Sequence, residues 1–212
     1  AMIVIKIGGS IFGKEGKLLT DIAKLGEPLV LVHGGAAQTT ALAERMHVPV
    51  EYITSPEVFR SRRTTREMAE IFVMAVAGKI NKSLVAGLQG HSVNAVGVCG
   101  MDGGMLCAKR KMLTSVEDGK SRIVRDDYTG KIGKVDVKLL RTLLENGFVP
   151  VVAPITLSEE FEPLNSDGDR AAAMIASALG AEKLVLFTDV EGFFEEFPDG
   201  LVQEMNAGKI DE

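Results

Sequence analysis

The stretch MIVIKIGGS, residues 2–10, joins an apolar run directly to a lysine and a pair of glycines. Its apolar part is continuous rather than alternating, which is typical of a strand buried on both faces. Lys6 at the strand end, next to the bare backbone of Gly8 and Gly9, suits an anion such as phosphate, although Gly-Gly after a strand is also a common way to turn a chain. The stretch therefore predicts a buried strand whose end is a candidate anion site.

Three further apolar runs have the same continuous character and alternate with helical patterns. The runs are PLVLVHGG (28–35), FVPVVAP (148–154) and KLVLFTD (183–189), and the helical stretches cover 36–46, 64–88, 137–147 and 169–180. Thr64 or Thr65 is a natural N-cap, and Gly147 and Gly180 are C-cap signals. The pattern predicts a three-layer α/β/α fold with an open, mostly parallel sheet, and hairpins projecting from roughly 98–135.

The composition fits an ordinary globular chain, and its length suits one large domain or two small ones. Of 212 residues, 46% are hydrophobic and 25% are charged, and no apolar run approaches the roughly 18 residues of a membrane span. The chain also lacks the basic-then-apolar start of a secretion signal. Cys99 and Cys107 are too few for a disulfide framework or a zinc site, so we expect reduced, mostly buried thiols and a cytoplasmic location.

Positive charge is concentrated in two segments of an otherwise acidic chain. The net charge is −5, but the stretch from Lys109 to Arg141 holds ten Lys and Arg against five Asp and Glu. A second basic cluster is RSRR plus Arg66, in residues 60–66. Such a surface suits an acidic partner or an anionic substrate, and it is also compatible with a solvated hairpin face.

Polar and glycine residues follow the predicted strands where ligands gather in an open α/β sheet. Gly34 and Gly35 lead directly into a helix, which is the geometry of an anion site. The sequence has no P-loop motif, no dinucleotide fingerprint and no nucleophile elbow, so these three classes are unsupported. His33 has no triad context, and we interpret it as structural rather than catalytic.

Taken in order, the motifs KIGGS, VHGG, FRSR…TREM…AGKINKSLV and NSDGDRAAAMIASALGAEKLVLFTDVEG resemble the amino acid kinase family. The resemblance runs from about residue 2 to 200 and is strongest to acetylglutamate kinases. Within them, SPEVFRSRRTTRE and the basic segment after residue 107 favour the branch that phosphorylates glutamate or 2-aminoadipate on a small acidic amino-group carrier protein. The resemblance implies an ATP-dependent carboxylate kinase of arginine or lysine biosynthesis.

The resemblance also implies roles for individual residues. Lys6 and Asp169 match the catalytic positions, and the implied substrate-binding residues are Gly34, Gly35, Arg62 and Asn165. The implied nucleotide-binding residues are Gly8, Gly9, Ser10, Thr188, Asp189 and Gly192. The resemblance implies that the nucleotide is ATP with Mg²⁺, and no metal ligand is assigned in the protein. A homodimer that includes the helix with Phe72 and Met74 is expected, and neither nucleic acid nor membrane is an expected partner.

Simpler interpretations of these residues remain open at this stage. Lys6 is also compatible with a solvated strand end, and Arg60 with the role given to Arg62. Asn165 and Asp169 also suit a helix cap and a first-turn acid. The acceptor is alternatively free N-acetylglutamate, and a non-catalytic member of the fold is a third hypothesis.

The chain departs from the family pattern in three places. Ala36 and Ala37 stand where relatives have a third glycine or a serine, and Arg63 and Thr65 stand where relatives often have an aromatic residue and an acid. Relatives also continue for roughly one more strand–helix–strand unit, with a lysine that contacts the nucleotide. We therefore expect one domain over 1–212, with its acceptor part over about 1–150 and a shortened nucleotide part over about 151–212.

Overall fold

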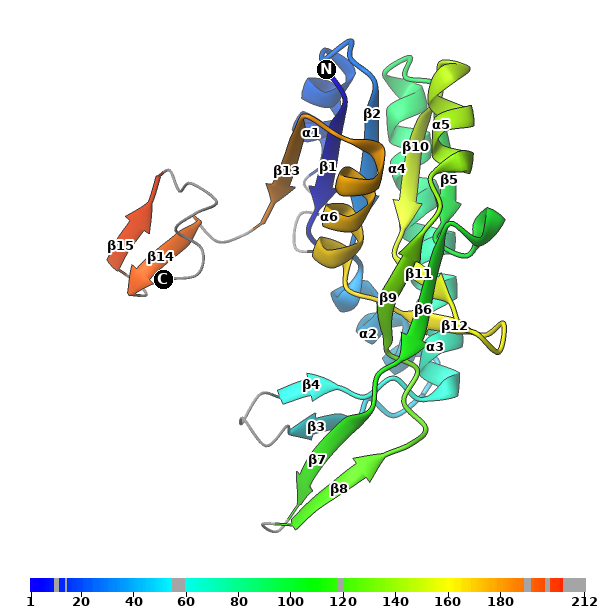
Figure 1. Ribbon diagram of the computed structural model, residues 1–212, viewed down its shortest axis with the longest axis vertical. Helices are drawn as coiled ribbons and strands as arrows, with labels where there is room; N and C mark the ends of the chain where they lie inside the picture. The colour runs from blue at the N-terminus through cyan, green and yellow to red at the C-terminus, as the bar shows by residue number, and fades with distance from the viewer. Residues whose placement is uncertain are drawn as a thin grey trace.

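A computed structural model describes residues 1–9, 12–13, 15–54, 60–117, 120–188, 192–196 and 199–203. Its centre is a five-stranded sheet of β1 (Ile3–Ile7), β2 (Leu29–His33), β5 (Ala95–Cys99), β10 (Val149–Ala153) and β13 (Lys183–Phe187). The strand order is β13-β1-β2-β10-β5, and every neighbouring pair is parallel. The carboxyl ends of the strands therefore meet at one edge of the sheet, as Figure 1 shows.

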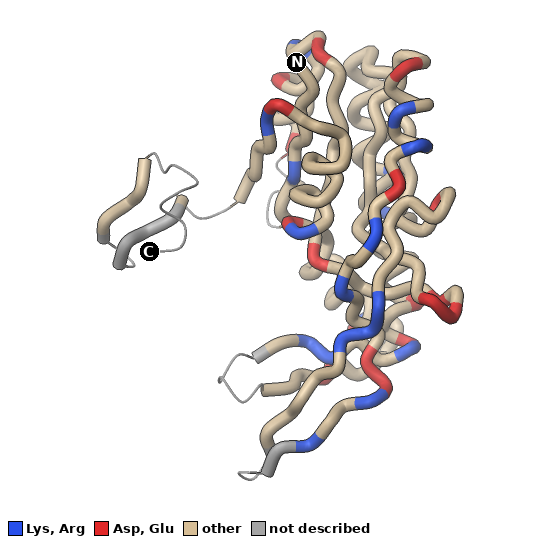
Figure 2. The backbone as a smooth tube through the Cα atoms, in the orientation of Figure 1, with Lys and Arg blue, Asp and Glu red and all other residues tan. Residues whose placement is uncertain are grey.

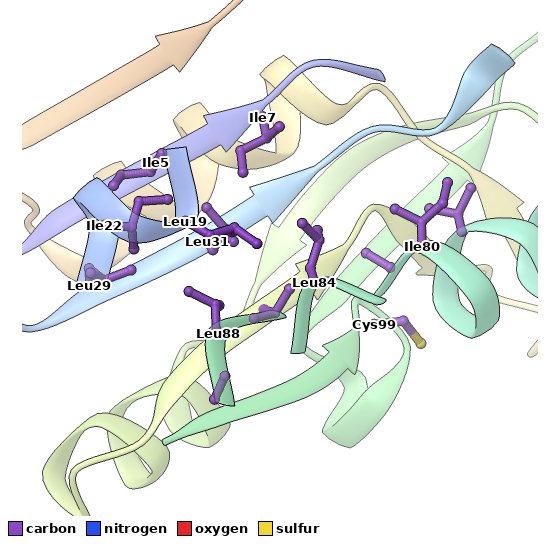
Figure 3. Close-up of a cluster of buried hydrophobic side chains, with 14 of the residues drawn as sticks. Ile5, Ile7, Leu19, Ile22, Leu29, Leu31, Ile80, Leu84, Leu88 and Cys99 are labelled. Carbon is purple, nitrogen blue, oxygen red and sulfur yellow. The ribbon is translucent and has the colours of Figure 1, made fainter. Parts of the chain in front are cut away.

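Helices cover both faces of this sheet, which confirms the predicted three layers. One face packs against α1 (Gly16–Ala23) and α4 (Asn81–Gly90), and the other against α5 (Lys138–Glu145) and α6 (Gly168–Leu179). Alternate strand residues divide between the two layers, since Ile3, Ile5 and Ile7 face one core and Val4 the other. Figure 3 shows the first of these cores between β1, β2, α1 and α4.

The long apolar stretch predicted as a helix is continuous from Arg66 to Gly90. It consists of α3 (Arg66–Phe72), a π-helical segment (Val73–Ile80) and α4, and Thr65 caps it by accepting from the Met68 N–H at 3.2 Å. Length and composition alone would let this helix cross a membrane, since its mean hydropathy is 1.5. Leu84 and Leu88 instead pack against the central sheet of the chain itself. The absence of a membrane partner stays a prediction.

A smaller second sheet lies below the first in Figure 1. Its strands are β6 (Leu106–Arg110), β9 (Gly130–Val135), β11 (Ile155–Leu157) and β12 (Pro163–Asn165), in the order β12-β11-β6-β9. Two antiparallel hairpins project from this end, namely β3 (Tyr52–Thr54) with β4 (Arg60–Arg62) and β7 (Leu113–Glu117) with β8 (Lys120–Val124). The prediction of projecting hairpins is thus confirmed, and the segment 95–99 proves to be a strand of the main sheet.

The described chain closes with β14 (Phe193–Glu196) and β15 (Asp199–Val202), an antiparallel hairpin that lies apart from the sheet in Figure 1. The remaining helix, α2 (Ala36–Arg45), follows β2 directly. At the edge of the main sheet, next to β1, β13 has partly exposed apolar side chains, with Leu184, Val185 and Leu186 between 36% and 44% exposed. The site sits where β1, β2 and the starts of α2 and α6 come together.

Candidate active site

A cleft of about 450 Å³ opens at the carboxyl ends of β1 and β2. Its lining comes from the two glycine turns, from the N-termini of α2 and α6, and from the end of β13. Helix N-termini present N–H groups and the positive end of the helix dipole. The cleft is therefore suited to an anion on backbone grounds alone.

Lys6 and Asp169 form an ion pair inside this cleft, with 2.7 Å between Lys6 Nζ and Asp169 Oδ1. The lysine side chain is only 12% exposed, whereas the carboxylate is 55% exposed. β1 carries the lysine, and the first turn of α6 carries the aspartate. The carboxylate thus holds a partly buried ammonium group at a fixed place in the cleft, and the interpretation of Lys6 as a solvated strand end is wrong.

The two glycine pairs lie against each other. A Cβ atom added to Gly9 would lie 3.5 Å from Gly35 N, and one added to Gly34 would lie 3.5 Å from Gly9 N. The N–H groups of Gly8 and Gly34 continue the sheet, since they donate to Phe187 O at 2.9 Å and to Ile7 O at 3.0 Å. Among the described residues, no partner is found for the N–H groups of Gly9 and Gly35. These two donors are placed to bind a ligand.

Gly35 is required by packing as well as by its place in the cleft. A Cβ atom there would lie 2.5 Å from Ile80 Cδ1 and 2.9 Å from Val76 Cγ2, both in the π-helical segment. The N-terminus of α2 therefore sits directly on this segment, and a side chain at residue 35 would push the two apart.

Asn165, the last residue of β12, also lines the cleft. Its Nδ2 donates to Thr64 Oγ1 at 3.1 Å, and the Thr64 N–H donates to the buried carboxylate of Asp127 at 2.9 Å. The N-cap of α6 is Asp167, which accepts from the Arg170 N–H at 2.7 Å. The interpretation of Asn165 as a helix cap is therefore wrong, whereas Asp169 is both the first-turn acid and the partner of Lys6.

Arg62 reaches the first turn of α2 from the β3–β4 hairpin. Its Nη1 donates to Ala36 O at 3.1 Å and to Thr40 Oγ1 at 2.8 Å, and burial lowers its pKa. Ala36 lines the cleft, but Arg62 does not. Its role in holding a substrate carboxylate stays a prediction, and so does the alternative with Arg60, whose side chain lies outside the described residues.

The predicted nucleotide residues divide into three groups. Gly8, Gly9 and Thr188 line the cleft. Ser10 and Asp189 lie outside the described residues. Gly192 stands at the start of the β14–β15 hairpin, where an added Cβ would lie 3.0 Å from Leu201 Cδ1, and it is not part of the described lining.

Several lining residues carry no clear sequence signal. Phe72, 6% exposed, and Ser166, 3% exposed, both reach the cleft from the buried side. The Ser166 hydroxyl bonds to that of Thr156 at 2.8 Å. On the helix expected at a subunit interface, Phe72 is a core residue of this chain, whereas Met74 is 45% exposed, and the homodimer itself stays a prediction.

The described residues hold no group of three or more His, Cys, Asp or Glu side chains that could bind a metal ion. Mg²⁺ in phosphoryl-transfer sites is usually held by the substrate phosphates and one or two carboxylates. The donor set here is consistent with Mg²⁺ that enters with a nucleotide, and it does not form a metal site of its own.

A three-layer α/β/α fold with a lysine, two glycine turns and two helix N-termini around one cleft is the arrangement expected of an α/β protein that binds an anion. The chain belongs to the amino acid kinase family, which matches it over residues 1–212. It is 43% identical over 216 residues to the LysW-aminoadipate kinase of Deinococcus radiodurans, covering 99% of this chain and 74% of that protein. It is 42% identical over 199 residues to the LysW-aminoadipate/LysW-glutamate kinase of Saccharolobus solfataricus, covering 92% and 75%.

A solved structure of a different enzyme shares the fold. The N-acetylglutamate synthase of Neisseria gonorrhoeae, complexed with coenzyme A and N-acetyl-glutamate, is 30% identical with a TM-score of 0.69. The match covers 95% of this chain and 44% of that one. The fold therefore also occurs within an enzyme that is named as a synthase rather than as a kinase.

Proposed function

We propose that this chain is an ATP-dependent kinase that phosphorylates the side-chain carboxylate of a carrier-linked 2-aminoadipate or glutamate. The observation that carries the proposal is the Lys6–Asp169 ion pair of 2.7 Å, in the same cleft as Gly9 and Gly35, whose N–H groups have no partner among the described residues. The names of the relatives from Deinococcus and Saccharolobus support the acceptor. The activity would belong to arginine or lysine biosynthesis.

The reaction needs positioning and charge compensation rather than a general base. A carboxylate is already ionised at neutral pH, so its oxygen attacks the γ-phosphorus directly, while the bond to the β,γ-bridging oxygen breaks and ADP leaves. Lys6 offsets the negative charge that spreads over the phosphoryl oxygens, and Asp169 holds its ammonium group in place. The N–H groups of Gly9 and Gly35 bind oxygens of the reacting groups.

The two sides of the cleft suit the two substrates. We assign the acceptor to the side formed by residues 1–150, with Gly34, Gly35 and Arg62, to which β12 adds Asn165. We assign the nucleotide to the side of residues 151–212 together with Gly8 and Gly9. Ser10, Thr188, Asp189 and Gly192 complete the proposed nucleotide set. Mg²⁺ would enter with the ATP phosphates and add positive charge there.

A basic hairpin surface suits an acidic carrier protein. We name the face formed by residues 110–112 and 123–125 the hairpin face; it borders a hollow of about 270 Å³ and exposes Met112 (87%) and Ile123 (60%) beside Lys111 and Arg125. Figure 2 shows positive segments along β4, between β6 and β7, and on β8. Attraction between opposite charges speeds the encounter of the two partners, and salt weakens this attraction. Exposed apolar side chains add contact area.

The cluster at residues 60–66 offers less charge to a partner than the sequence predicts. Arg63 pairs with Glu51 at 2.6 Å and with Asp126 at 2.5 Å, and Arg66 lies 3.9 Å from Glu70. We therefore place the carrier on the hairpin face. The double substitution Lys111→Glu with Arg125→Glu should raise KM for the carrier-linked acceptor about tenfold and leave KM for ATP unchanged. The matched control is Lys17→Glu on α1 with Lys24→Glu at its C-cap.

We also propose a homodimer that uses the Met74 side of the long helix. Met74 is 45% exposed in a helix whose other apolar side chains are mostly buried. Light scattering at micromolar concentration tests this, and a monomer would contradict it.

The acceptor is tested by an acyl phosphate assay. The chain is given ATP, Mg²⁺ and one of three acceptors, carrier-linked aminoadipate, carrier-linked glutamate or free N-acetylglutamate, and hydroxylamine traps the product as a hydroxamate. Turnover only with the carrier-linked acceptors supports the proposal, and preference for the free molecule favours an N-acetylglutamate kinase. Nucleotide binding without any turnover would favour a non-catalytic member of the fold.

A further inference from the structure

His33 is a fully buried polar residue that the proposed reaction does not use. It ends β2 directly before the glycine turn and is 0% exposed. Its Nδ1 lies 2.9 Å from the carbonyl oxygen of Gly34, and its Nε2 lies 3.1 Å from Nδ2 of Asn81. Both ring nitrogens therefore have a defined partner, one in the glycine turn and one in the long helix.

The partners fix which nitrogen carries the proton. A carbonyl oxygen only accepts, so Nδ1 must donate to Gly34 O, and in a neutral ring Nε2 then accepts. The donor is the Asn81 amide, whose Nδ2 also lies 2.9 Å from Val151 O. On its other side, Asn81 Oδ1 accepts from Lys82 Nζ at 3.0 Å, which sets the orientation of the amide. Burial lowers the pKa of His33 to about 4, in agreement with a neutral ring.

The space for this network depends on Gly97 in β5. A Cβ atom at Gly97 would lie 1.9 Å from Asn81 Oδ1 and 2.6 Å from Lys82 Nζ. Lys82 Nζ also donates to Gly97 O at 2.9 Å. A strand glycine, a helix amide and a strand-end imidazole thus meet in one network, in which the Asn81 Nδ2 also lies 3.3 Å from Val98 O.

The consequence lies in the peptide that joins Gly34 to Gly35. A trans peptide is planar, so its C=O and its N–H point in opposite directions. Because His33 holds the Gly34 carbonyl on the buried side, the Gly35 N–H is turned toward the cleft. Glycines have no Cβ to restrict rotation of the Gly34–Gly35 peptide plane, so the turn by itself would not hold this peptide in one orientation.

We infer that His33, held in its Nδ1–H tautomer by Asn81, is a positioning residue that aims the Gly35 N–H at the reacting oxygens. The inference rests on the proposed function, since it assigns this N–H to the phosphoryl-transfer step. His33 itself touches no substrate. It acts through one peptide group, in the way that a preorganised backbone donor stabilises charge as it develops.

The tautomer is measured first, on the unsubstituted chain and without substrate. Two-dimensional ¹H–¹⁵N spectra of ¹⁵N-histidine-labelled protein at pH 7 distinguish the two neutral tautomers and the imidazolium. The inference predicts a protonated Nδ1 and an unprotonated Nε2 at His33. An Nε2–H tautomer or an imidazolium overturns it.

Kinetics then separate positioning from mere packing. His33→Leu keeps an apolar volume but has no donor, and should lower kcat by about 10²-fold with both KM values changed by less than about threefold. His33→Asn keeps a short-range donor for Gly34 O and should recover at least about tenfold of that loss. His91→Asn, at an exposed histidine bonded to Thr20, is the matched control and should leave kcat unchanged.

The outcomes are distinct. If folded His33→Leu retains kcat, or if His33→Asn is as slow as His33→Leu at equal melting temperature, the inference is overturned. If His33→Leu does not fold, two measurements still test the inference. One is the kcat of His33→Asn relative to the unsubstituted chain, and the other is the tautomer spectrum. If the unsubstituted chain turns over no acceptor, the proposed function fails, whereas the tautomer measurement still tests the placement of His33.

Discussion

Replacing Lys6 by Met removes one positive charge from the cleft and keeps the apolar stem of the side chain. The stem matters because the lysine is only 12% exposed. The expected result is a large loss of kcat with little loss of stability. Asp169 is 55% exposed, so water can solvate its carboxylate when Lys6 is replaced. We therefore expect the loss of the ion pair to lower the free energy of unfolding by at most about 1 kcal/mol.

The magnitude of the rate effect follows from the geometry. Lys6 Nζ is held 2.7 Å from Asp169 Oδ1 at the wall of the cleft, and a phosphoryl oxygen would contact it at a similar distance. With that oxygen in contact, the ammonium charge and the centre of the phosphoryl charge lie about 4 Å apart, and two unit charges at this separation interact by about 4 kcal/mol at an effective dielectric constant of about 20. Part of this is already present in the ground state, so we expect about 3–4 kcal/mol in the transition state, or a fall in kcat of about 10²–10³-fold.

The assay is hydroxamate formation at saturating ATP and acceptor, with thermal melting of each variant measured in parallel. The matched control is Lys24→Met, which removes an exposed lysine 3.4 Å from Asp21 and should change neither kcat nor the melting temperature by a measurable amount. If Lys6→Met keeps kcat within about threefold of the unsubstituted chain, the charge is not used in the transition state and the reasoning is refuted.

Three further predictions rest on other parts of the site. Arg62→Ala should raise KM for the acceptor about tenfold and KM for ATP much less, because a guanidinium that holds a carboxylate is a binding element. Equal changes in the two KM values would contradict the assignment of Arg62 to the acceptor. Gly35→Ala should lower the free energy of unfolding by about 1–3 kcal/mol in denaturant titrations, since the new Cβ would lie 2.5 Å from Ile80 Cδ1, whereas Gly133→Ala, with open space at its Cβ, should cost little. Stability should fall as the pH drops from about 6.5 to about 4, because unfolded His33 binds a proton over that range and the buried ring, with its pKa lowered to about 4, does not. The loss should reach about 3 kcal/mol and level off below pH 4, and a pH series of melting curves in which His33→Asn shows the same loss would contradict it.

The central sheet is predictable from sequence because most of its strands are continuous apolar runs. As predicted, β1, β2 and β10 are buried on both faces, whereas β13, at the edge of the sheet, is largely exposed. The runs at residues 2–7, 28–33, 148–153 and 183–187 are apolar without alternation, and each is a parallel strand. β5 could not be predicted in the same way, since Gly97 interrupts its run and the segment precedes a region rich in turn residues. The reason for that glycine is a contact with Asn81 and Lys82, which is a property of the packed fold.

The candidate site shows the same division. Lys6, the glycine turns and Asp169 follow from the position of charge and glycine at strand and helix ends, and they meet in one cleft. The bond from His33 to Asn81 joins residues 48 positions apart and depends on the register of the π-helical segment, so no local pattern indicates it. Similarly, Asp167 rather than Asn165 caps α6, a choice that depends on where the helix begins.

The most direct test of the proposed reaction follows an oxygen atom from the acceptor carboxylate to phosphate. The chain is given ATP, Mg²⁺ and a carrier-linked aminoadipate whose side-chain carboxylate carries ¹⁸O at both oxygens, and hydroxylamine cleaves the product at its acyl carbon. Attack of the carboxylate on the γ-phosphorus predicts that each phosphate released by hydroxylamine contains one ¹⁸O atom, seen as an isotope shift in its ³¹P spectrum. Phosphate without label would show that water, rather than the carboxylate, takes the phosphoryl group, and would contradict the account.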